Sequence, residues 1–132
     1  MNGDHSKPVI LVADDDEDFR YLIRHMLGDT DYRVVEATNG REAVSAAVDE
    51  QPDLILMDLQ MPMLNGIAAT RLIRQRAECR KVPIIILSVY DPEQHAKVAL
   101  AAGGTLFFQK PLEIDHLKAV IDRFLRRGPI PT

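Results

Sequence analysis

The chain lacks the means to form an internal disulfide, because Cys79 is its one cysteine among 132 residues. It also lacks a long apolar run: the longest extends from Val82 to Leu87, far shorter than a bilayer-spanning helix. Residues 1–7 are polar and have none of the apolar core of a secretory signal. These absences favour a cytoplasmic protein with no membrane segment.

Basic residues are not in excess, since 16 Lys and Arg stand against 20 Asp and Glu, for a net charge of −4. Proteins that bind the phosphate backbone of nucleic acids normally carry a basic surplus, so we expect no direct nucleic-acid binding. A local basic run is typical of a solvated helix face. It consists of Arg71, Arg74, Arg76, Arg80 and Lys81.

A chain of this length suits one domain with a substantial hydrophobic core. We expect a flexible N-terminus over residues 1–7, a single domain over residues 8–127 and a tail over residues 128–132. The tail begins with Gly128-Pro129, a pair that ends helices.

Short runs rich in β-branched and aliphatic residues alternate with helical patterns along the whole chain. The predicted strands are Val9–Ala13, Arg33–Glu36, Leu54–Met57, Ile84–Leu87 and Leu106–Phe108. The first, third and fourth are almost wholly apolar, as strands are when helices cover both faces of a parallel sheet. The alternation predicts an α/β fold, a doubly wound parallel sheet built from five βα units.

Helical periodicity accounts for the intervals between the strands. The first helix is predicted from an apolar stripe of Phe19, Leu22, Ile23, Met26 and Leu27. Asn39 and Glu42 have the spacing of a capping box for the second helix. The remaining predicted helices are Ile67–Ala77 with Ala69, Leu72 and Ile73 on its apolar side, a helix from the Asp91-Pro92 cap to Ala102, and a stripe from Ile114 to Leu125.

Polar side chains follow four of the predicted strands at their carboxyl ends, the edge at which doubly wound sheets bind ligands. They are Asp14, Asp15 and Asp16 after the first strand, Asp58 after the third, Ser88 after the fourth and Lys110 after the fifth. Helix capping can explain Asp16 but not the grouping of the other acids. Clustered carboxylates raise one another's pKa unless a cation lies among them, and oxygen ligands suit Mg²⁺. The edge therefore predicts phosphoryl transfer, with positive charge from Mg²⁺ and Lys110 and a hydrogen bond from Ser88.

The sequence resembles the receiver domains of bacterial response regulators over about residues 8–127. The motifs that carry the resemblance are Val9-Ile-Leu-Val-Ala-Asp-Asp15, Asp58-Leu-Gln-Met-Pro-Met-Leu-Asn-Gly66, Ile84-Ile-Ile-Leu-Ser88 and Lys110-Pro111. The resemblance implies a flavodoxin-like, five-stranded sheet of order 2-1-3-4-5 and a cis peptide bond before Pro111. It also implies a two-component function, in which a histidine kinase or phosphotransfer protein phosphorylates Asp58.

The same resemblance implies roles for further residues. Asp15, Asp58 and the backbone carbonyl of Gln60 would bind Mg²⁺, with Asp14 acting through water. Ser88 and Phe107 would form the switch: Ser88 moves onto the phosphoryl group and Phe107 then turns inward. The downstream protein target would bind the face formed by residues 91–127. No enzymatic activity is expected beyond self-phosphorylation from phosphodonors and slow autodephosphorylation.

Some residues near this edge depart from the family pattern or vary within it. Val89 stands where the family usually has a small residue, and we expect it to crowd the pocket floor. Gln60 and Tyr90 occupy positions that, in the family, influence how fast water attacks the acyl phosphate. We expect Tyr90 to lie across the opening and exclude water. Phe107 lacks the hydroxyl of the tyrosine often found at its position.

Three other functions are alternatives to the receiver. A phosphatase of the haloacid dehalogenase type also uses a strand-end Asp, a second Asp two residues on, a Ser or Thr and a Lys. In that family the further metal-binding acids follow the lysine. In this chain the other strand-end acid, Asp58, precedes Lys110. A flavodoxin-like cofactor binder would meet repulsion between a phosphate and the acids of residues 14–18, and no G-x-G-x-x-G is present. A degenerate receiver that only binds a partner would not need all the residues of the phosphorylation site, and this chain has the complete set of Asp14, Asp15, Asp58, Ser88 and Lys110.

Overall fold

The structure, a computed structural model, describes residues 7–28 and 31–125. Within these ranges the strands are β1 (Val9–Ala13), β2 (Arg33–Ala37), β3 (Leu54–Asp58), β4 (Ile84–Ser88) and β5 (Leu106–Gln109). The α-helices are α1 (Glu17–Leu27), α2 (Gly40–Glu50), α3 (Gly66–Gln75), α4 (Pro92–Ala101) and α5 (Ile114–Leu125), and a short 3₁₀ turn, η2, covers Ala77–Cys79. The predicted N-terminal segment, apart from Lys7, and the predicted tail lie outside the described residues, as do the last two residues of the predicted domain.

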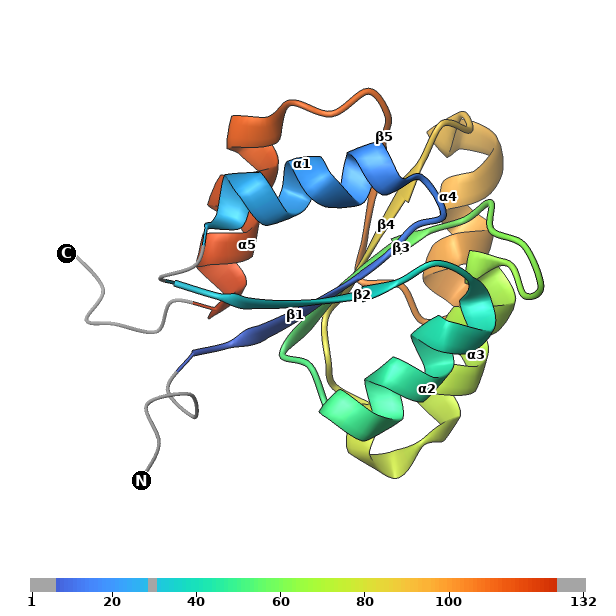
Figure 1. Ribbon diagram of the computed structural model, residues 1–132. Coiled ribbons are helices and arrows are strands. Elements are labelled where there is room, and N and C mark those ends of the chain that lie inside the picture. The colour runs from blue at the N-terminus through green and yellow to red at the C-terminus, as the bar shows by residue number, and fades with distance from the viewer. Residues whose placement is uncertain (1–6, 29–30, 126–132) are drawn as a thin grey trace, which may run out of the picture.

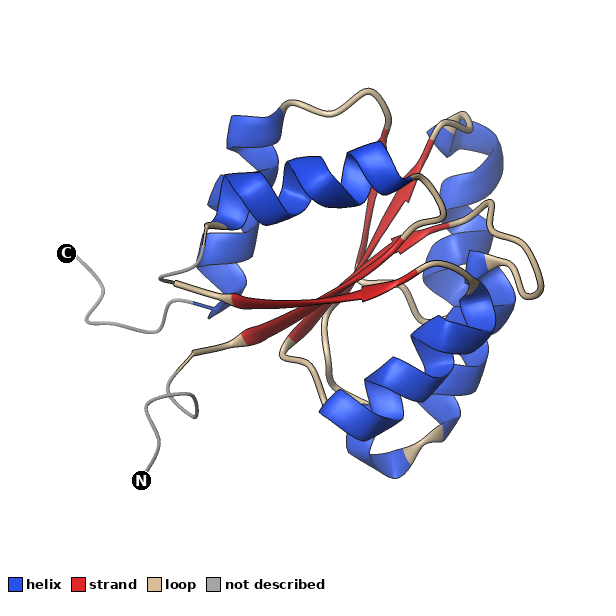
Figure 2. Ribbon diagram, viewed as in Figure 1, coloured by secondary structure: helices blue, strands red, loops and turns tan. Residues whose placement is uncertain are grey.

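All strand pairs are parallel and the sheet has the order β2-β1-β3-β4-β5, which confirms the predicted topology. Figure 1 shows α1 and α5 on one face of the sheet and α2, α3 and α4 on the other. The same three layers are visible when the elements are coloured by type in Figure 2. None of the helices in the described ranges is long and apolar enough to cross a bilayer.

Side chains of the central strands alternate between two separate hydrophobic cores, one on each face of the sheet. On the face covered by α1 and α5, the strand residues of the core are Ile10, Val12, Leu54, Leu56, Ile85 and Leu87. On the face covered by α2, α3 and α4, they are Leu11, Ala13, Ile55, Met57, Ile84 and Ile86. Complete burial of an aliphatic side chain contributes about 1.5–3 kcal/mol, so this pattern strongly sets the register of each strand.

The alternation also decides which way the strand-end polar residues face. Asp14 and Asp58 continue the rows of even-numbered residues that face α1 and α5. Ser88 continues the row of Ile84 and Ile86, which faces α4. The acidic residues and the hydroxyl thus approach the same edge of the sheet from opposite faces.

Two predicted apolar stripes differ from the packing in the structure. Leu22 is 42% exposed, and its expected place in the core is taken by Arg20, which is only 8% exposed and aligns with the buried Ile23 and Leu27. The guanidinium can be buried because Glu36 and the backbone carbonyl of Asp14 accept its hydrogen bonds. Leu72 is likewise exposed, and α3 ends at Gln75, before the separate turn η2.

Side-chain caps begin the first four helices. Asp16 accepts a hydrogen bond from the backbone N–H of Asp18, so helix capping does explain this acid. Asn39 accepts from the N–H of Glu42 at 2.8 Å, as predicted. The reciprocal bond of the expected capping box is displaced by one residue, because Glu42 Oε1 accepts from the N–H and hydroxyl of Thr38. Asp91 caps α4 from the position that the sequence predicts.

Candidate functional site

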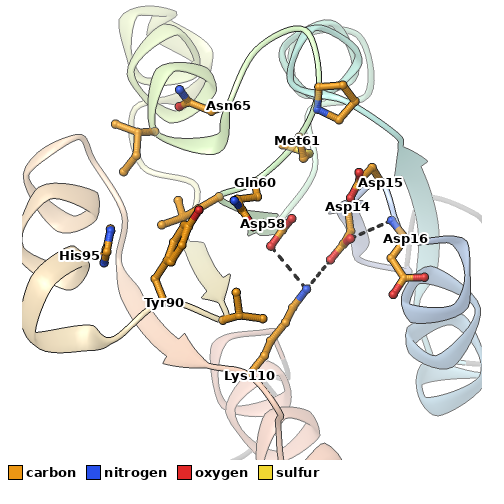
Figure 3. A pocket seen from close by; sticks show the side chains of 14 residues that line it. Asp14, Asp15, Asp16, Asp58, Gln60, Met61, Asn65, Tyr90, His95 and Lys110 are labelled. Atoms are coloured by element: carbon orange, nitrogen blue, oxygen red, sulfur yellow. Dashed lines mark hydrogen bonds and ion pairs between the residues drawn. The ribbon is translucent and has the colours of Figure 1, made fainter.

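A pocket of about 770 Å³ lies at the carboxyl ends of the strands, where the sequence predicts a ligand site. Its lining brings together residues that are far apart in the chain, as Figure 3 shows. The predicted site residues that line it are Asp14, Asp15, Asp58, Gln60, Val89, Tyr90 and Lys110, joined by Asp16, Met61, Asn65 and His95 among others.

Lys110 supplies positive charge to the lining of this pocket. Its Nζ lies 2.7 Å from Asp14 Oδ2 and 3.4 Å from Asp58 Oδ1, and both contacts are drawn in Figure 3. The lysine side chain is 17% exposed, and the two carboxylates are more deeply buried. Because partial burial weakens screening by water, this lysine can polarise a group bound at Asp58 more strongly than a surface lysine could.

Three carboxylates gather beside the lysine. Oxygen atoms of Asp14, Asp15 and Asp58 all lie within 4.8 Å of one another, and Asp15 is exposed while the other two are buried. Hard divalent cations with oxygen ligands suit such a group, and the exposed side leaves room for water or a phosphate oxygen. The donor set therefore fits Mg²⁺.

Burial raises the pKa of the Asp58 carboxyl to about 6, with a further contribution from the negative charge of Asp14. The charge and hydrogen bond of Lys110 oppose this rise. For Lys110, burial lowers the pKa of the ammonium, but the contacts with Asp14 and Asp58 outweigh burial and leave it raised. At neutral pH Asp58 is therefore mainly ionised and Lys110 protonated, which are the states needed in a nucleophile and its electrostatic partner.

The loop after β3 is held tightly against the end of that strand. The N–H of Gly66 donates to the carbonyl of Leu59 at 2.9 Å, and a Cβ atom on Gly66 would lie 2.1 Å from the backbone oxygen of Asp58. Only glycine permits this approach, so Gly66 keeps the loop, with the exposed Gln60 in it, beside the acidic group. Asn65 begins α3 here by accepting from the N–H of Ala68.

Arg20 supports the acidic side of the pocket and was not identified from the sequence. Its Nη1 donates a hydrogen bond to the backbone oxygen of Asp14 at 2.8 Å, and its Nε donates to Glu36. Glu36 also accepts a hydrogen bond from Arg24. Burial raises the pKa of Glu36, but these two arginines outweigh it and leave that pKa lowered. The sequence signal was available, because residue 20 precedes Ile23 and Leu27 by three and seven positions on the buried helix face.

Ser88 lies one residue beyond Leu87, which pairs with Asp58 in the register of β3 and β4. It is 1% exposed, and its Oγ accepts a hydrogen bond from the N–H of Tyr90 at 3.0 Å. The hydroxyl proton remains available for donation because the oxygen is the acceptor in that bond. Phe107, the other expected switch residue, is half-buried against the core formed with α2, α3 and α4.

Val89 and Tyr90, the two residues after Ser88, both line the pocket. Val89 is 59% exposed and is one of the residues that line the pocket, so its effect on access to the phosphate stays a prediction. It follows a buried strand residue and faces outward where the pleated chain leaves the sheet. Tyr90 is half-buried, and its ring stacks on His95 with centroids 4.4 Å apart. His95 was not predicted as a pocket residue; it lies one helical turn after the cap residue Asp91.

The peptide bond between Lys110 and Pro111 is cis, the isomer expected from the Lys-Pro pair. The N–H of Lys110 donates to the carbonyl of Ser88 at 2.7 Å. This backbone bond ties the residue that supplies the ammonium to the end of β4.

Comparisons with known proteins agree with this geometry. Residues 10–122 match the family model described as response regulator receiver domain. The protein PilH of Pseudomonas aeruginosa is 34% identical over 88% of this chain and 96% of its own length. The alkaline phosphatase synthesis transcriptional regulatory protein PhoP of Bacillus subtilis is also 34% identical, but the match covers 50% of that protein.

Solved structures give the same result. The receiver domain of a sensor histidine kinase from Pseudomonas aeruginosa, with a magnesium ion coordinated in its active-site cleft, is 33% identical with a TM-score of 0.81. That alignment covers 89% of this chain and 97% of the other. Chemotaxis protein CheY4 of Vibrio cholerae is 28% identical with a TM-score of 0.83, over 90% of this chain and 99% of the other.

Proposed function

Because the chain belongs to the response regulator receiver domain family and is a receiver of two-component signalling, we propose that Asp58 is its phosphoacceptor. The observation that carries the proposal is the Asp58 carboxylate at the end of β3, in contact with Lys110 and beside two further acids. Membership of this family also removes the phosphatase and flavodoxin-like alternatives. The finer assignments below concern this chain's own residues.

In the proposed reaction an Asp58 oxygen bonds to phosphorus as the bond from phosphorus to the donor breaks. From a histidine kinase or phosphotransfer protein the leaving group is imidazole, which takes up a proton. Lys110 and the Ser88 hydroxyl bind oxygens of the transferred group, and Ser88 moves inward to do so. Asp15, Asp58 and the Gln60 carbonyl would hold Mg²⁺, with Asp14 acting through water, and the ion would supply positive charge to the phosphoryl oxygens.

The phosphorylated state changes a protein-binding face, which we assign to residues 91–127. The motion of Ser88 is transmitted to α4 through Tyr90, whose N–H binds the Ser88 oxygen and whose ring stacks on His95. Phe107 packs against the same core as Tyr90, which supports a role for it in the switch. The described residues of this face form α4, β5 and α5, and residues 126–127 lie outside the described ranges.

Incubation with acetyl phosphate and Mg²⁺ tests the assignment of the phosphoacceptor. One phosphoryl group should be added per chain, measured by intact mass, and hydroxylamine should remove it as expected for an acyl phosphate. Peptide mapping should place the group on Asp58, and Asp58→Asn should take up none. A phosphoryl group on Asp14 or on a serine would refute the proposal.

Mg²⁺ should raise the melting temperature of the wild-type protein, since a ligand that binds only the folded state stabilises it by mass action. At ten times its dissociation constant the gain is about 1.4 kcal/mol, or roughly 3–6 °C for a domain of this size. Asp15→Asn should flatten this response in a thermal titration. Asp53→Asn, which removes a carboxylate at the other end of the sheet beside Val9, should respond like wild type. Equal responses of both variants would exclude the acidic group as the metal site.

Tyr90→Ala should shorten the lifetime of the phosphorylated protein by about tenfold, roughly 1.4 kcal/mol of barrier. The ring forms part of the pocket wall and is held there by His95, so its removal opens the approach of water to phosphorus. Phosphate release at fixed Mg²⁺ measures the rate. Tyr21→Ala, at an exposed tyrosine of α1, provides the matched control. An unchanged or slower release in Tyr90→Ala would show that the ring does not shield the phosphate.

A further inference from the structure

Lys110 has an aromatic neighbour as well as its two carboxylates. Its Nζ lies 4.3 Å from the centroid of the Phe19 ring on α1. Phe19 packs against the core formed with α1 and α5, so the ring is anchored from behind. The ammonium therefore lies between Asp14 and Asp58 on one side and the ring of Phe19 on another.

We propose that Phe19 is a positioning residue for phosphoryl transfer, which holds the Lys110 ammonium at the phosphoacceptor through a cation–π contact. The inference rests on the proposed function, because it concerns the cation that acts on the phosphoryl group at Asp58. It assigns to the first helix a part in the chemistry of the site.

The surroundings of the ammonium explain why an aromatic ring is effective here. Next to Lys110 is a mainly apolar groove, of about 420 Å³, whose lining includes Phe19, Leu22, Leu112 and Ile114. A lysine has a flexible stem and a strongly hydrated head, and its ammonium loses part of its water shell beside such a surface. The negative face of an aromatic ring compensates for this loss, and the attraction is stronger where water is partly excluded.

The contact also suits a lysine that must change partners. Nζ is closer to Asp14 than to Asp58, so it has to shift when a phosphoryl group appears on Asp58. A carboxylate at position 19 would compete with the phosphoryl group for the ammonium. A ring face attracts the charge without a directed hydrogen bond, so the ammonium can move along it while it stays within the pocket.

Fluorinated phenylalanines test the electrostatic part of this contact with little change in shape. We would place 4-fluoro-, 3,5-difluoro- and 3,4,5-trifluorophenylalanine at position 19, since each fluorine withdraws electron density from the ring face. The rate of Asp58 phosphorylation by acetyl phosphate with Mg²⁺, followed by intact mass, should fall stepwise. The trifluoro ring should reduce the rate by about three- to tenfold, the range expected for loss of a partly desolvated cation–π contact.

The same three substitutions at Phe124 provide the matched control. Phe124 packs against the same core as Phe19, but it belongs to α5 near its end. Fluorination there should leave the rate unchanged. In addition, the Cε protons of Lys110 should show an upfield ring-current shift in NMR spectra of the wild-type protein, and Phe19→Leu should abolish it.

The possible results separate this inference from the proposed function. A stepwise loss at position 19 alone supports the positioning role. Equal effects at positions 19 and 124, no effect at position 19, or a Lys110 signal unchanged in Phe19→Leu would overturn that role while phosphorylation of Asp58 stands. A wild-type protein that takes up no phosphoryl group would overturn the proposed function, and this inference with it.

Discussion

Lys110→Met should slow phosphorylation of Asp58 by acetyl phosphate about a hundredfold, or ~2.7 kcal/mol of transition-state stabilisation. The ammonium lies 3.4 Å from Asp58 Oδ1, at the place where negative charge accumulates on the phosphoryl oxygens. Methionine keeps an unbranched stem that can pack against Phe19, so the substitution removes the charge with little loss of volume. Initial rates at fixed Mg²⁺, measured by intact mass, report the change.

A change in the ionisation of Asp58 can be separated from this direct effect. Lys110 lowers the pKa of Asp58 through its charge and hydrogen bond, so its loss raises that pKa and protonates more of the nucleophile at pH 7. If protonation were the whole cause, a rise to pH 9 would restore the wild-type rate. We expect the deficit to persist at pH 9 because the transferred group still lacks its cation.

Lys97→Met controls for the general loss of a positive charge. Lys97 is exposed on α4, so this variant should be phosphorylated at the wild-type rate. Recovery of Lys110→Met to the wild-type rate at pH 9 would contradict a direct role. An equal deficit in Lys97→Met would show that net charge, and not the position of Lys110, governs the reaction with the anionic donor.

The fold, and which residues belong to the site, could be predicted because both follow from the pattern of apolar residues in the strands. Apolar runs such as Ile84–Leu87 are buried on both faces, and this requirement sets strand positions and the edge at which they end. Asp14 and Asp58 stand at the ends of two such runs, and Lys110 follows the half-buried strand β5. Their convergence needs only the parallel arrangement of the strands. The order of the apolar strands and of the polar residues that follow them is therefore enough to predict where the site lies.

The orientation of individual side chains could not be obtained in the same way. Val89 follows Ser88 directly, and its size alone suggested the pocket floor. Its direction depends on how the chain leaves β4 toward the cap of α4, a three-dimensional feature with no sequence periodicity. His95 contacts Tyr90 for a similar reason, since the angle between loop and helix brings the two rings together.

Arg20 illustrates a different limit. An arginine between Phe19 and Tyr21 is normally assigned to the solvent side of an amphipathic helix, because a buried charge without partners is costly. The structure supplies these partners from the carbonyl of Asp14 and from Glu36, 16 residues away on β2. Helical spacing places Arg20 on the buried face, but only the packed fold brings Glu36 to it.

Asp58→Asn should stabilise the metal-free protein at pH 8 by about 2 kcal/mol. The pKa of Asp58 is about 6 in the folded state, above the ordinary value of 3.8, because ionisation is opposed by burial and by Asp14. An acid whose pKa is raised by folding binds more protons in the folded state, so stability falls as pH rises from about 4 to above 6. Two pKa units correspond to ~2.7 kcal/mol, and residual access of water reduces this figure. Asparagine has nearly the same shape and carries no charge to bury.

The pH dependence of the difference is what identifies the cause. Urea unfolding in EDTA between pH 4 and pH 8 should show a gap between Asp58→Asn and wild type that opens through the pKa of Asp58 and closes toward pH 4. Glu36→Gln tests the opposite sign: the lowered pKa of Glu36 means that its ion pairs stabilise the wild type above the ordinary Glu pKa and are lost in acid. This variant should be less stable than wild type at pH 8. Two results would mean that charge burial at the phosphoacceptor is not the destabilising force. One is a difference in stability between Asp58→Asn and wild type that is constant with pH, and the other is an Asp58→Asn protein that is less stable than wild type at pH 8.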